Sequence, residues 1–195
     1  MYRNFIKRIV DIVCALAALP LIIILIIVVW ILILFDDKGP VFYSAPRMGK
    51  DGRVFNMLKF RSMKVNSPDI RNADGSTFNG TDDPRVTIVG RFLRKTSLDE
   101  VPQLLNVLIG DMSLIGPRPS LTTTPYNNYS DIRKKRVSVR PGVTGYSQAY
   151  FRNSISQDEK CEKDCWYVDN ITFVNDMKII VKTIISVIKK DNIYN

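Results

Sequence analysis

The sequence predicts an α-rich α+β protein whose N-terminal helix is embedded in a membrane. Three observations predict this class. Residues 12–35 form a long apolar run, residues 54–63 read as a strand of a small β element, and residues 158–190 show the spacing of amphipathic interfacial helices. We therefore expect a membrane segment over residues 1–38 and one membrane-associated domain over residues 39–195.

The apolar run is long enough to cross a bilayer. It contains twenty-four residues without a charged side chain, so a straight helix would measure about 36 Å against a hydrocarbon core of roughly 30 Å. The run is too long for the core of a cleaved signal peptide, and no small-residue cleavage site follows Phe35. On hydropathy alone, the run is explained by a single-pass transmembrane anchor.

Two features favour a re-entrant hairpin over that anchor. Pro20 lies inside the run, where it removes a backbone hydrogen bond that lipid cannot replace. Basic residues flank the run on both sides, whereas a span should carry its excess of Lys and Arg at the cytoplasmic end; they are Arg3, Lys7, Arg8, Arg47, Lys50 and Arg53. A helix that enters one leaflet, bends near Pro20 and returns to the same face satisfies both observations. Asp36 and Asp37 dilute the charge argument, so the sequence leaves both alternatives open.

The middle of the chain predicts a strand, a long loop and a helix. Residues 54–63 follow a turn at residues 51–52, and strand alternation places Lys59 and Arg61 on one face. Residues 64–85 are rich in Asn, Asp, Ser, Gly and Pro, which fits either a functional loop or a loose insertion. A helix over residues 99–109 is expected to end at Gly110, because glycine readily adopts the left-handed backbone of a helix terminus.

The C-terminal stretch, residues 158–190, is expected to be largely helical. In its last part, apolar residues recur at helical spacing with lysines between them. This pattern suits a helix that lies in the membrane interface. It suits equally an amphipathic helix that only covers the core.

The composition excludes several kinds of catalytic site. The chain has no histidine, which removes Ser–His–Asp triads, Cys–His pairs and HExxH metal sites. Any catalysis must use carboxylates, basic residues, Tyr, Ser, Thr or Cys, with any metal held by oxygen ligands. Cys14 lies in the apolar run, and Cys161 and Cys165 stand at helical spacing, where packing is the expected role. A reducing, cytoplasmic setting follows for the polar part of the chain.

Asp99 and Glu100 are adjacent carboxylates at the start of a predicted helix. Pro102 fits the first turn of that helix, where its missing N–H is not needed. Asp99 is then either an ordinary N-cap, or Ser97 and Glu100 form a capping box. The alternative is chemical: a helix N-terminus favours an ionised carboxylate and attracts phosphate, and an ionised Asp can attack phosphorus.

Basic side chains near the carboxylate pair fit the second interpretation. Phosphoryl transfer needs Mg²⁺ and cationic side chains to offset charge on the phosphoryl oxygens. Arg118 lies between two prolines, which hold its backbone extended. Each cation taken singly is also explained as a solvated surface charge. The candidates are Arg94, Arg118, Lys59 and Arg61.

Two further segments are candidates for ligand binding. Residues 140–148 form a Pro/Gly turn with Arg140, Tyr146 and Gln148, which could hold a nucleobase or sugar or could be a well-packed turn. The basic residues 133–136 could rest on anionic headgroups. Nucleic acid is a less suitable partner for them, because the chain carries a bilayer-embedded segment.

The ordered series of motifs resembles the bacterial sugar transferases, the monotopic phosphoglycosyl transferases that act on polyprenyl phosphate. The motifs are KFRSM at 59–63, DDPRVTIVGRFLRKTSLDEVPQLLNVLIGDMSLIGPRPS at 82–120, PGVTGYSQ at 141–148 and WYVDN at 166–170. The likeness covers nearly the whole chain. Its length resembles that of the minimal catalytic members of the family.

The resemblance implies an enzyme that transfers a sugar 1-phosphate from a UDP-sugar to undecaprenyl phosphate, with release of UMP and a requirement for Mg²⁺. It implies a ping-pong route through a covalent phosphosugar on Asp99, which would also contact the metal, with Glu100 assisting proton handling or alignment. Arg94 and Arg118 fall on the family's phosphate-handling arginines, and Lys59 and Arg61 on its strand motif. The resemblance also favours the re-entrant helix at the inner face of the cytoplasmic membrane.

The chain departs from the family pattern at two places. Leu19 precedes Pro20 where the family usually has Ser, so the hydroxyl that could bond a freed carbonyl is missing. Tyr146 and Ser147 stand where many relatives have Trp-Ala. Two rival functions stay open: a single-displacement transferase in which Asp99 only binds Mg²⁺, and a membrane-anchored scaffold without activity. The sugar and the oligomeric state are not fixed by the sequence, and a homo-oligomer is one alternative.

Overall fold

The computed structural model describes residues 1–70, 78, 83–152 and 154–189. Its helices are α1 Lys7–Asp36, α2 Ile88–Lys95, α3 Gln103–Ile109, α4 Asp131–Arg136, α5 Tyr146–Tyr150, α6 Gln157–Asp169 and α7 Phe173–Lys189. A π-helical turn, Tyr2–Ile6, precedes α1, and short 3-10 turns cover Lys50–Gly52, Leu98–Glu100 and Tyr126–Asn128. The strands are β1 Phe42–Met48, β2 Val54–Phe60, β3 Ser113–Ile115, β4 Ser120–Leu121 and β5 Gly142–Thr144. The α-rich class with small β elements is confirmed.

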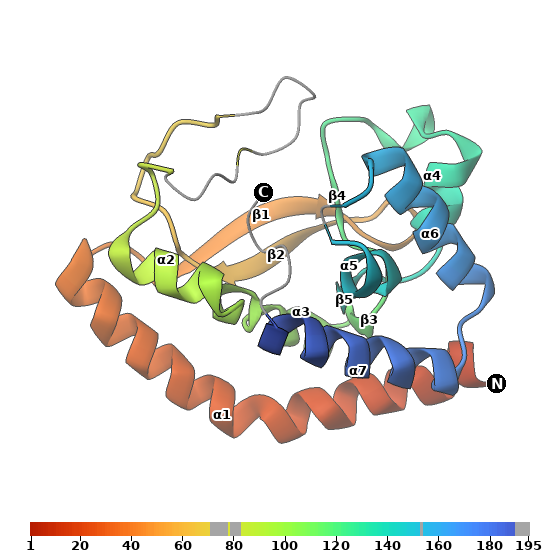
Figure 1. The fold of residues 1–195 in the computed structure, drawn as a ribbon, viewed down its shortest axis with the longest axis horizontal. Coiled ribbons are helices and arrows are strands. Elements are labelled where there is room, and N and C mark those ends of the chain that lie inside the picture. The colour runs from red at the N-terminus through yellow and green to blue at the C-terminus, as the bar shows by residue number, and fades with distance from the viewer. Residues whose placement is uncertain (71–77, 79–82, 153, 190–195) are drawn as a thin grey trace.

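Two small sheets form the centre of the domain. The first has the order β2-β1-β4 and is antiparallel, with Phe42 opposite Phe60 and Met48 opposite Val54 in the β1–β2 pair. The second pairs β3 with β5 in parallel. Helices α2, α3 and α7 lie between these sheets and the long helix α1 (Figure 1).

The long helix α1 curves beneath the rest of the molecule (Figure 1). It is the one helix in the described residues that is long and apolar enough to cross a membrane, and only 17% of its most apolar window is buried. The predicted apolar helix is therefore present. Its backbone stays helical through Pro20, so the structure does not show the break expected there.

The end of α1 is fastened to the domain by two acidic side chains. Asp36 accepts a hydrogen bond of 3.0 Å from the backbone N–H of Val89, which is the second residue of α2. Asp37 forms a bidentate ion pair with Arg61, with Oδ1 2.6 Å from Nη2. Below these contacts, Val29 and Ile33 of α1 pack in one core cluster with Phe60 and Leu93.

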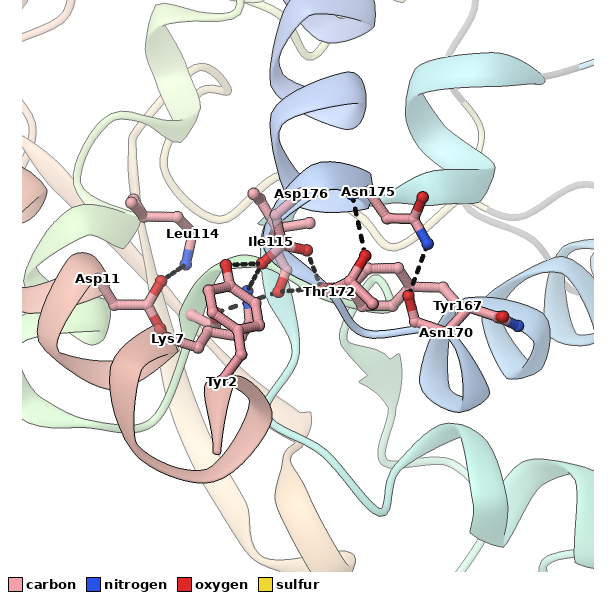
Figure 2. A network of polar contacts seen from close by, with 11 residues as sticks. Tyr2, Lys7, Asp11, Leu114, Ile115, Tyr167, Asn170, Thr172, Asn175 and Asp176 are labelled. Atoms are coloured by element: carbon pink, nitrogen blue, oxygen red, sulfur yellow. Dashed lines mark hydrogen bonds and ion pairs between the residues drawn. The ribbon is translucent and has the colours of Figure 1, made fainter.

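The beginning of α1 is fastened to the same domain by a buried polar network (Figure 2). Lys7 forms an ion pair with Asp176 of α7 at 2.7 Å, and Tyr2 and Tyr167 donate to the same carboxylate at 2.6 and 2.7 Å. One turn further along α1, Asp11 accepts the backbone N–H of Leu114 at 3.0 Å. Both ends of the apolar helix are thus held by one domain.

These contacts correct the interpretation of the basic flanks. Lys7 is paired with Asp176, and Arg8 donates to the carbonyls of Val107 and Leu108 at the end of α3. Two of the three basic residues before the run therefore serve internal contacts. Their charges are not free flanking charges of the kind on which the topology rule depends.

The strand and helix boundaries differ in part from the predicted ones. β2 ends at Phe60 rather than at residue 63, because the chain turns there and Arg61 is drawn to Asp37, so Lys59 and Arg61 do not share a strand face. The helix predicted over residues 99–109 is divided into a 3-10 turn and α3. Its end at Gly110, with φ 104°, is confirmed.

The C-terminal stretch is helical as predicted, with a break between α6 and α7. The basic residues 133–136 lie on α4, on the side of the molecule away from α1 (Figure 1). Lys135 and Arg136 are paired with Asp169 and Asp164 of α6. This segment therefore does not face lipid on the side where α1 lies. Half of the loop predicted over residues 64–85, namely residues 71–77 and 79–82, lies outside the described residues.

Candidate functional site

Asp99 and Glu100 lie on the 3-10 turn that joins α2 to α3. The turn is opened by Ser97, whose φ of 57° is in the left-handed region, which is unusual for a residue other than glycine. No side-chain capping bond is formed by Ser97, so the capping box is not present. Asp99 makes no cap either, because α3 begins only at Gln103. The ordinary capping explanation for the carboxylate pair is therefore wrong.

Lys59, at the end of β2, brings its ammonium group between the two carboxylates. Its Nζ lies 2.6 Å from Oε1 of Glu100 and 3.8 Å from Oδ2 of Asp99. The position follows from the strand: Asn106 of α3 bonds the β2 backbone at residues 56 and 58, which fixes β2 against the segment that carries the carboxylates. Strand and carboxylate turn are thus locked together.

Two arginines approach the pair from other elements. Nη2 of Arg118 lies 3.5 Å from Oε1 of Glu100, and its side chain is 51% exposed, so a ligand could reach it from solvent. Arg94 of α2 donates from Nε to the hydroxyl of Ser62 at 2.9 Å. Its charge also acts on Asp99 and lowers the pKa of that carboxyl. Four elements therefore converge on one site.

The two carboxyls differ in their protonation properties. Burial raises the pKa of Asp99 above its usual value, and the negative charge of Glu100 adds to the rise, although Lys59, Arg94 and Arg118 oppose it. Burial acts in the same direction on Glu100, but the charges and hydrogen bonds of Lys59 and Arg118 outweigh it and lower the pKa to about 2. Glu100 is consequently the more strongly stabilised anion of the two, and the ionised form of Asp99 is the less stabilised.

Arg61 is not among the side chains gathered at the carboxylates. Its guanidinium is occupied by Asp37 and by the backbone carbonyls of Pro40 and Met63, and only 7% of the side chain is exposed. It holds the chain segment that leaves α1. A role in phosphate binding is not compatible with these contacts.

The candidates from residues 140–148 also lie elsewhere. Arg140 donates to the carbonyl of Gly110, beyond the C-terminal end of α3 and so at the opposite end of that helix from Asp99. Tyr146 stacks with Trp166 and Tyr150, with ring centroids 4.6 and 4.8 Å away. Gln148 keeps a buried Oε1 without a hydrogen-bond partner among the described residues. Of the two alternatives for residues 140–148, a ligand site or a well-packed turn, the packing of the Tyr146 ring favours the well-packed turn.

Ser62 is a site residue that the sequence did not single out. Its hydroxyl accepts the Arg94 bond, and its carbonyl accepts the N–H of Thr87 at the start of α2. Gly90 packs so closely on the Ser62 backbone that an added Cβ would stand 2.0 Å from the carbonyl oxygen. The sequence signal that could have pointed to Ser62 is its position within the motif at residues 59–63; Gly90 lies within the motif at residues 82–120.

The site can contribute carboxylate oxygen to a metal ion but does not enclose one. The described residues contain no group of three or more Asp, Glu, Cys or His side chains placed for a metal. Mg²⁺ typically uses one or two protein carboxylates together with substrate phosphates and water. Because Glu100 is engaged by Lys59, Asp99 is the residue that fits this role.

Comparison with known proteins gives one consistent result. The family model described as bacterial sugar transferase matches residues 2–190. The chain is 41% identical, over 98% of its length, to an undecaprenyl-phosphate galactose phosphotransferase of Salmonella typhimurium, and 40% identical, over 92%, to a UDP-N-acetylgalactosamine-undecaprenyl-phosphate N-acetylgalactosaminephosphotransferase of Aeromonas hydrophila. It spans 42% and 43% of those two proteins. An uncharacterized sugar transferase of Bacillus subtilis, EpsL, is 39% identical, and the match covers 89% of it.

Proposed function

The chain belongs to the bacterial sugar transferase family, and we propose that it transfers a sugar 1-phosphate from a UDP-sugar to undecaprenyl phosphate. The products are a polyprenyl-diphosphate sugar and UMP. The observation that carries the proposal is the position of Asp99, a largely buried carboxylate surrounded by Lys59, Arg94 and Arg118. The names of the Salmonella and Aeromonas relatives describe the same class of reaction.

In the first half-reaction, an oxygen of Asp99 attacks the phosphorus that carries the sugar. A bond forms between this oxygen and phosphorus, the bond from phosphorus to the UMP oxygen breaks, and UMP leaves with the electron pair. In the second half-reaction, a phosphate oxygen of the lipid attacks the same phosphorus and the Asp99 carboxylate is released. Arg94, Arg118 and Lys59 offset the charge that builds on the phosphoryl oxygens.

Glu100 positions the cations rather than carrying a proton. With its pKa lowered to about 2, it is ionised at neutral pH and has no proton to give. Its contacts with Lys59 and Arg118 instead hold two cations on either side of the reacting group. Mg²⁺, held through Asp99, would supply further neutralisation of the diphosphate charge when bound.

The membrane arrangement that fits the structure is a re-entrant helix. A straight span would place the two ends of α1 on opposite faces of the bilayer, yet the contacts of Lys7 and Asp11 at one end and of Asp37 at the other all reach the same domain. The described part of the chain also exposes large apolar side chains on the helices next to α1, among them Ile88, Phe92, Ile109, Val174 and Val181. Such a surface fits the bilayer interface.

Lipid composition and sidedness follow from the same surface and the substrate. Lys178 and Lys182 lie among the exposed apolar residues of α7, where they can meet anionic headgroups. A soluble nucleotide sugar is reached from the cytoplasm, which places the domain at the inner face of the membrane. The active carboxylate then lies where a lipid phosphate and a nucleotide can both arrive.

The activity test is a panel of UDP-sugars presented with undecaprenyl phosphate and Mg²⁺, with UMP release as the readout. We expect UMP release with at least one sugar, and none in the Asp99→Asn variant. Absence of release with every sugar, from protein that is folded and in lipid, would contradict the proposed reaction and favour a scaffold.

Topology is tested by labelling single cysteines from one side of sealed vesicles, in a background without the native cysteines. Arg3→Cys and Lys38→Cys flank α1 at exposed positions. A re-entrant helix makes both react from the same side. Reaction from opposite sides would show a transmembrane span.

A further inference from the structure

Arg118 contacts Glu100 of the carboxylate pair and also belongs to a second group of basic side chains, together with Arg136 and Lys160. Its contact with Glu100 is at 3.5 Å, whereas Lys59 already lies 2.6 Å from the same oxygen. On its other side, Arg118 lines a small hollow together with Arg136 and Pro117.

Arg136 is held rigidly in this second group. Its Nε donates to Oδ2 of Asp164, which is fully buried on α6, and its Nη1 donates to the hydroxyl of Ser120, both at 2.8 Å. Ser120 follows Arg118 by two residues, so the two arginines are fixed on one short segment. The other oxygen of Asp164 is buried and has no hydrogen-bond partner in the part of the chain that the structure describes.

Lys160 completes the group from α6. It stands one helical turn before Asp164, on the same face of the helix, and it is partly buried. Burial and the positive charges of Arg118 and Arg136 lower the pKa of its ammonium group, and the negative charge of Asp164 opposes this only in part. Within the described residues, no carboxylate lies at ion-pair distance from it.

Three cations, Arg118, Arg136 and Lys160, therefore lie along two carboxylates, Glu100 and Asp164, so their charges are incompletely matched. Asp164 is committed to Arg136, and Glu100 is bound more closely by Lys59 than by Arg118. Three like charges with only two nearby carboxylates destabilise the fold, and a phosphate would relieve the excess positive charge with charge-assisted hydrogen bonds. A purely structural cluster would be expected to match its charges, as Lys7 and Asp176 do.

We propose that Arg118, Arg136 and Lys160 form a second phosphate subsite beside Asp99. It would hold the phosphate next to the one that reacts: that of the departing UMP in the first half-reaction, or a phosphate brought by the lipid in the second. This inference rests on the proposed transfer reaction. It adds Lys160 as a substrate-binding residue, on a helix that the motifs of the carboxylate site do not include.

The test compares Lys160→Gln with Lys163→Gln in the full-length protein in lipid nanodiscs. Lys163 lies on the same helix but is exposed, against the ring of Phe151, so both variants lose one charge from α6. Binding of UMP is titrated directly, and KM is measured separately for the UDP-sugar and for undecaprenyl phosphate. Thermal melts verify that both variants fold, and Lys160→Arg tests whether a cation suffices.

We expect Lys160→Gln to weaken UMP binding, or to raise one KM, by roughly ten- to a hundred-fold, with kcat changed much less and with recovery in Lys160→Arg. An effect on UMP and the UDP-sugar assigns the subsite to the nucleotide phosphate. An effect on undecaprenyl phosphate alone assigns it to the lipid phosphate.

Equal behaviour of Lys160→Gln and Lys163→Gln in all three measurements would overturn the subsite. Failure of the proposed function is recognised separately, because the wild-type protein would then release no UMP from any donor. The direct UMP titration still decides on the subsite in that case.

Discussion

The two polar clusters of this protein differ in how completely their charges are matched. In the network between α1 and α7, the Asp176 carboxylate accepts hydrogen bonds from Lys7, Tyr2 and Tyr167 (Figure 2). The Asp176 side chain is 1% exposed. At the other cluster, Asp99 has Lys59 no closer than 3.8 Å, and no described residue donates it a hydrogen bond. The first arrangement stabilises an anion, and the second leaves the carboxylate oxygens of Asp99 without hydrogen-bond donors among the described residues, as the proposed nucleophile requires.

The difference separates structural from chemical roles. A buried carboxylate whose two oxygens accept three hydrogen bonds has its charge offset by its donors, and it serves to fasten the helix. A buried carboxylate near cations, but not bonded to them, keeps its oxygens available while its charge is only partly offset. This contrast leads to four predictions, which vary one cluster against the other.

The largest effect is expected for Asp99→Asn. Loss of the nucleophile should lower turnover on the order of 10⁴-fold or more. The folded-state pKa of Asp99 is raised above the unfolded value, so ionisation at neutral pH costs folding stability, and the neutral amide should raise the melting temperature slightly. UMP release and thermal melts at pH 7 measure both. Full turnover, or marked destabilisation, would place Asp99 in the structural class.

Asp176→Ala should act in the opposite way. It leaves Lys7 buried without a partner, which typically costs about 3–5 kcal/mol of unfolding free energy. The matched control is Asp169→Ala, which breaks the exposed pair with Lys135 and should change the free energy of unfolding very little. Denaturation of both variants in the same lipid environment compares them. Equal losses would show that the network does not fasten α1.

Arg118→Ala tests the open side of the reactive cluster. If Arg118 offsets phosphoryl charge, turnover should fall about 10²–10³-fold. Its side chain is 51% exposed, so stability should change little. Arg53→Ala removes an exposed arginine away from the site and should leave the rate unchanged. A stability loss without a rate loss in Arg118→Ala would reverse its assignment.

The smallest effect is a shift in the pH dependence of Lys59→Gln. Attack requires ionised Asp99, so the rate of adduct formation falls as pH drops through the pKa of Asp99. Lys59 lowers that pKa, and its removal should move the acid limb of the profile to higher pH. Lys95→Gln, an exposed change on α2, should leave the limb in place. An unmoved limb in Lys59→Gln would indicate that another group controls the profile.

Local patterns in the sequence predicted the parts of the fold that depend on neighbouring residues. The apolar run, the glycine end of α3 and the helical C-terminus follow from periodicity and backbone preference, and they are present. Lys59, Asp99, Glu100 and Arg118 come together as the chemical interpretation required. Asp99, Glu100 and Arg118 lie in one segment of the sequence, so residue chemistry indicated one site there, whereas Lys59 joins them from 41 positions before Glu100.

Long-range pairing could not be predicted in this way. Lys7 and Asp176 lie 169 positions apart, and only folding shows that the supposed flanking charge is an internal ion pair. Arg61 likewise looked like a phosphate ligand until its partner Asp37 was located. Lys160 carried no local signal, because a lysine on an amphipathic helix normally faces solvent. For the ion pair between Lys7 and Asp176, the sequence offered one hint: Asp176 is a charged residue within an otherwise apolar helical pattern.

The central claim, that Asp99 becomes covalently attached to the sugar phosphate, is tested most directly by mass spectrometry of the enzyme with donor alone. The account predicts that, with a UDP-sugar accepted in the panel and no lipid acceptor, the peptide containing Asp99 gains the mass of the sugar phosphate while UMP is released. Addition of undecaprenyl phosphate should then remove that mass. Formation of product only when both substrates are present, with no modified peptide at any time, would contradict the claim and indicate direct transfer.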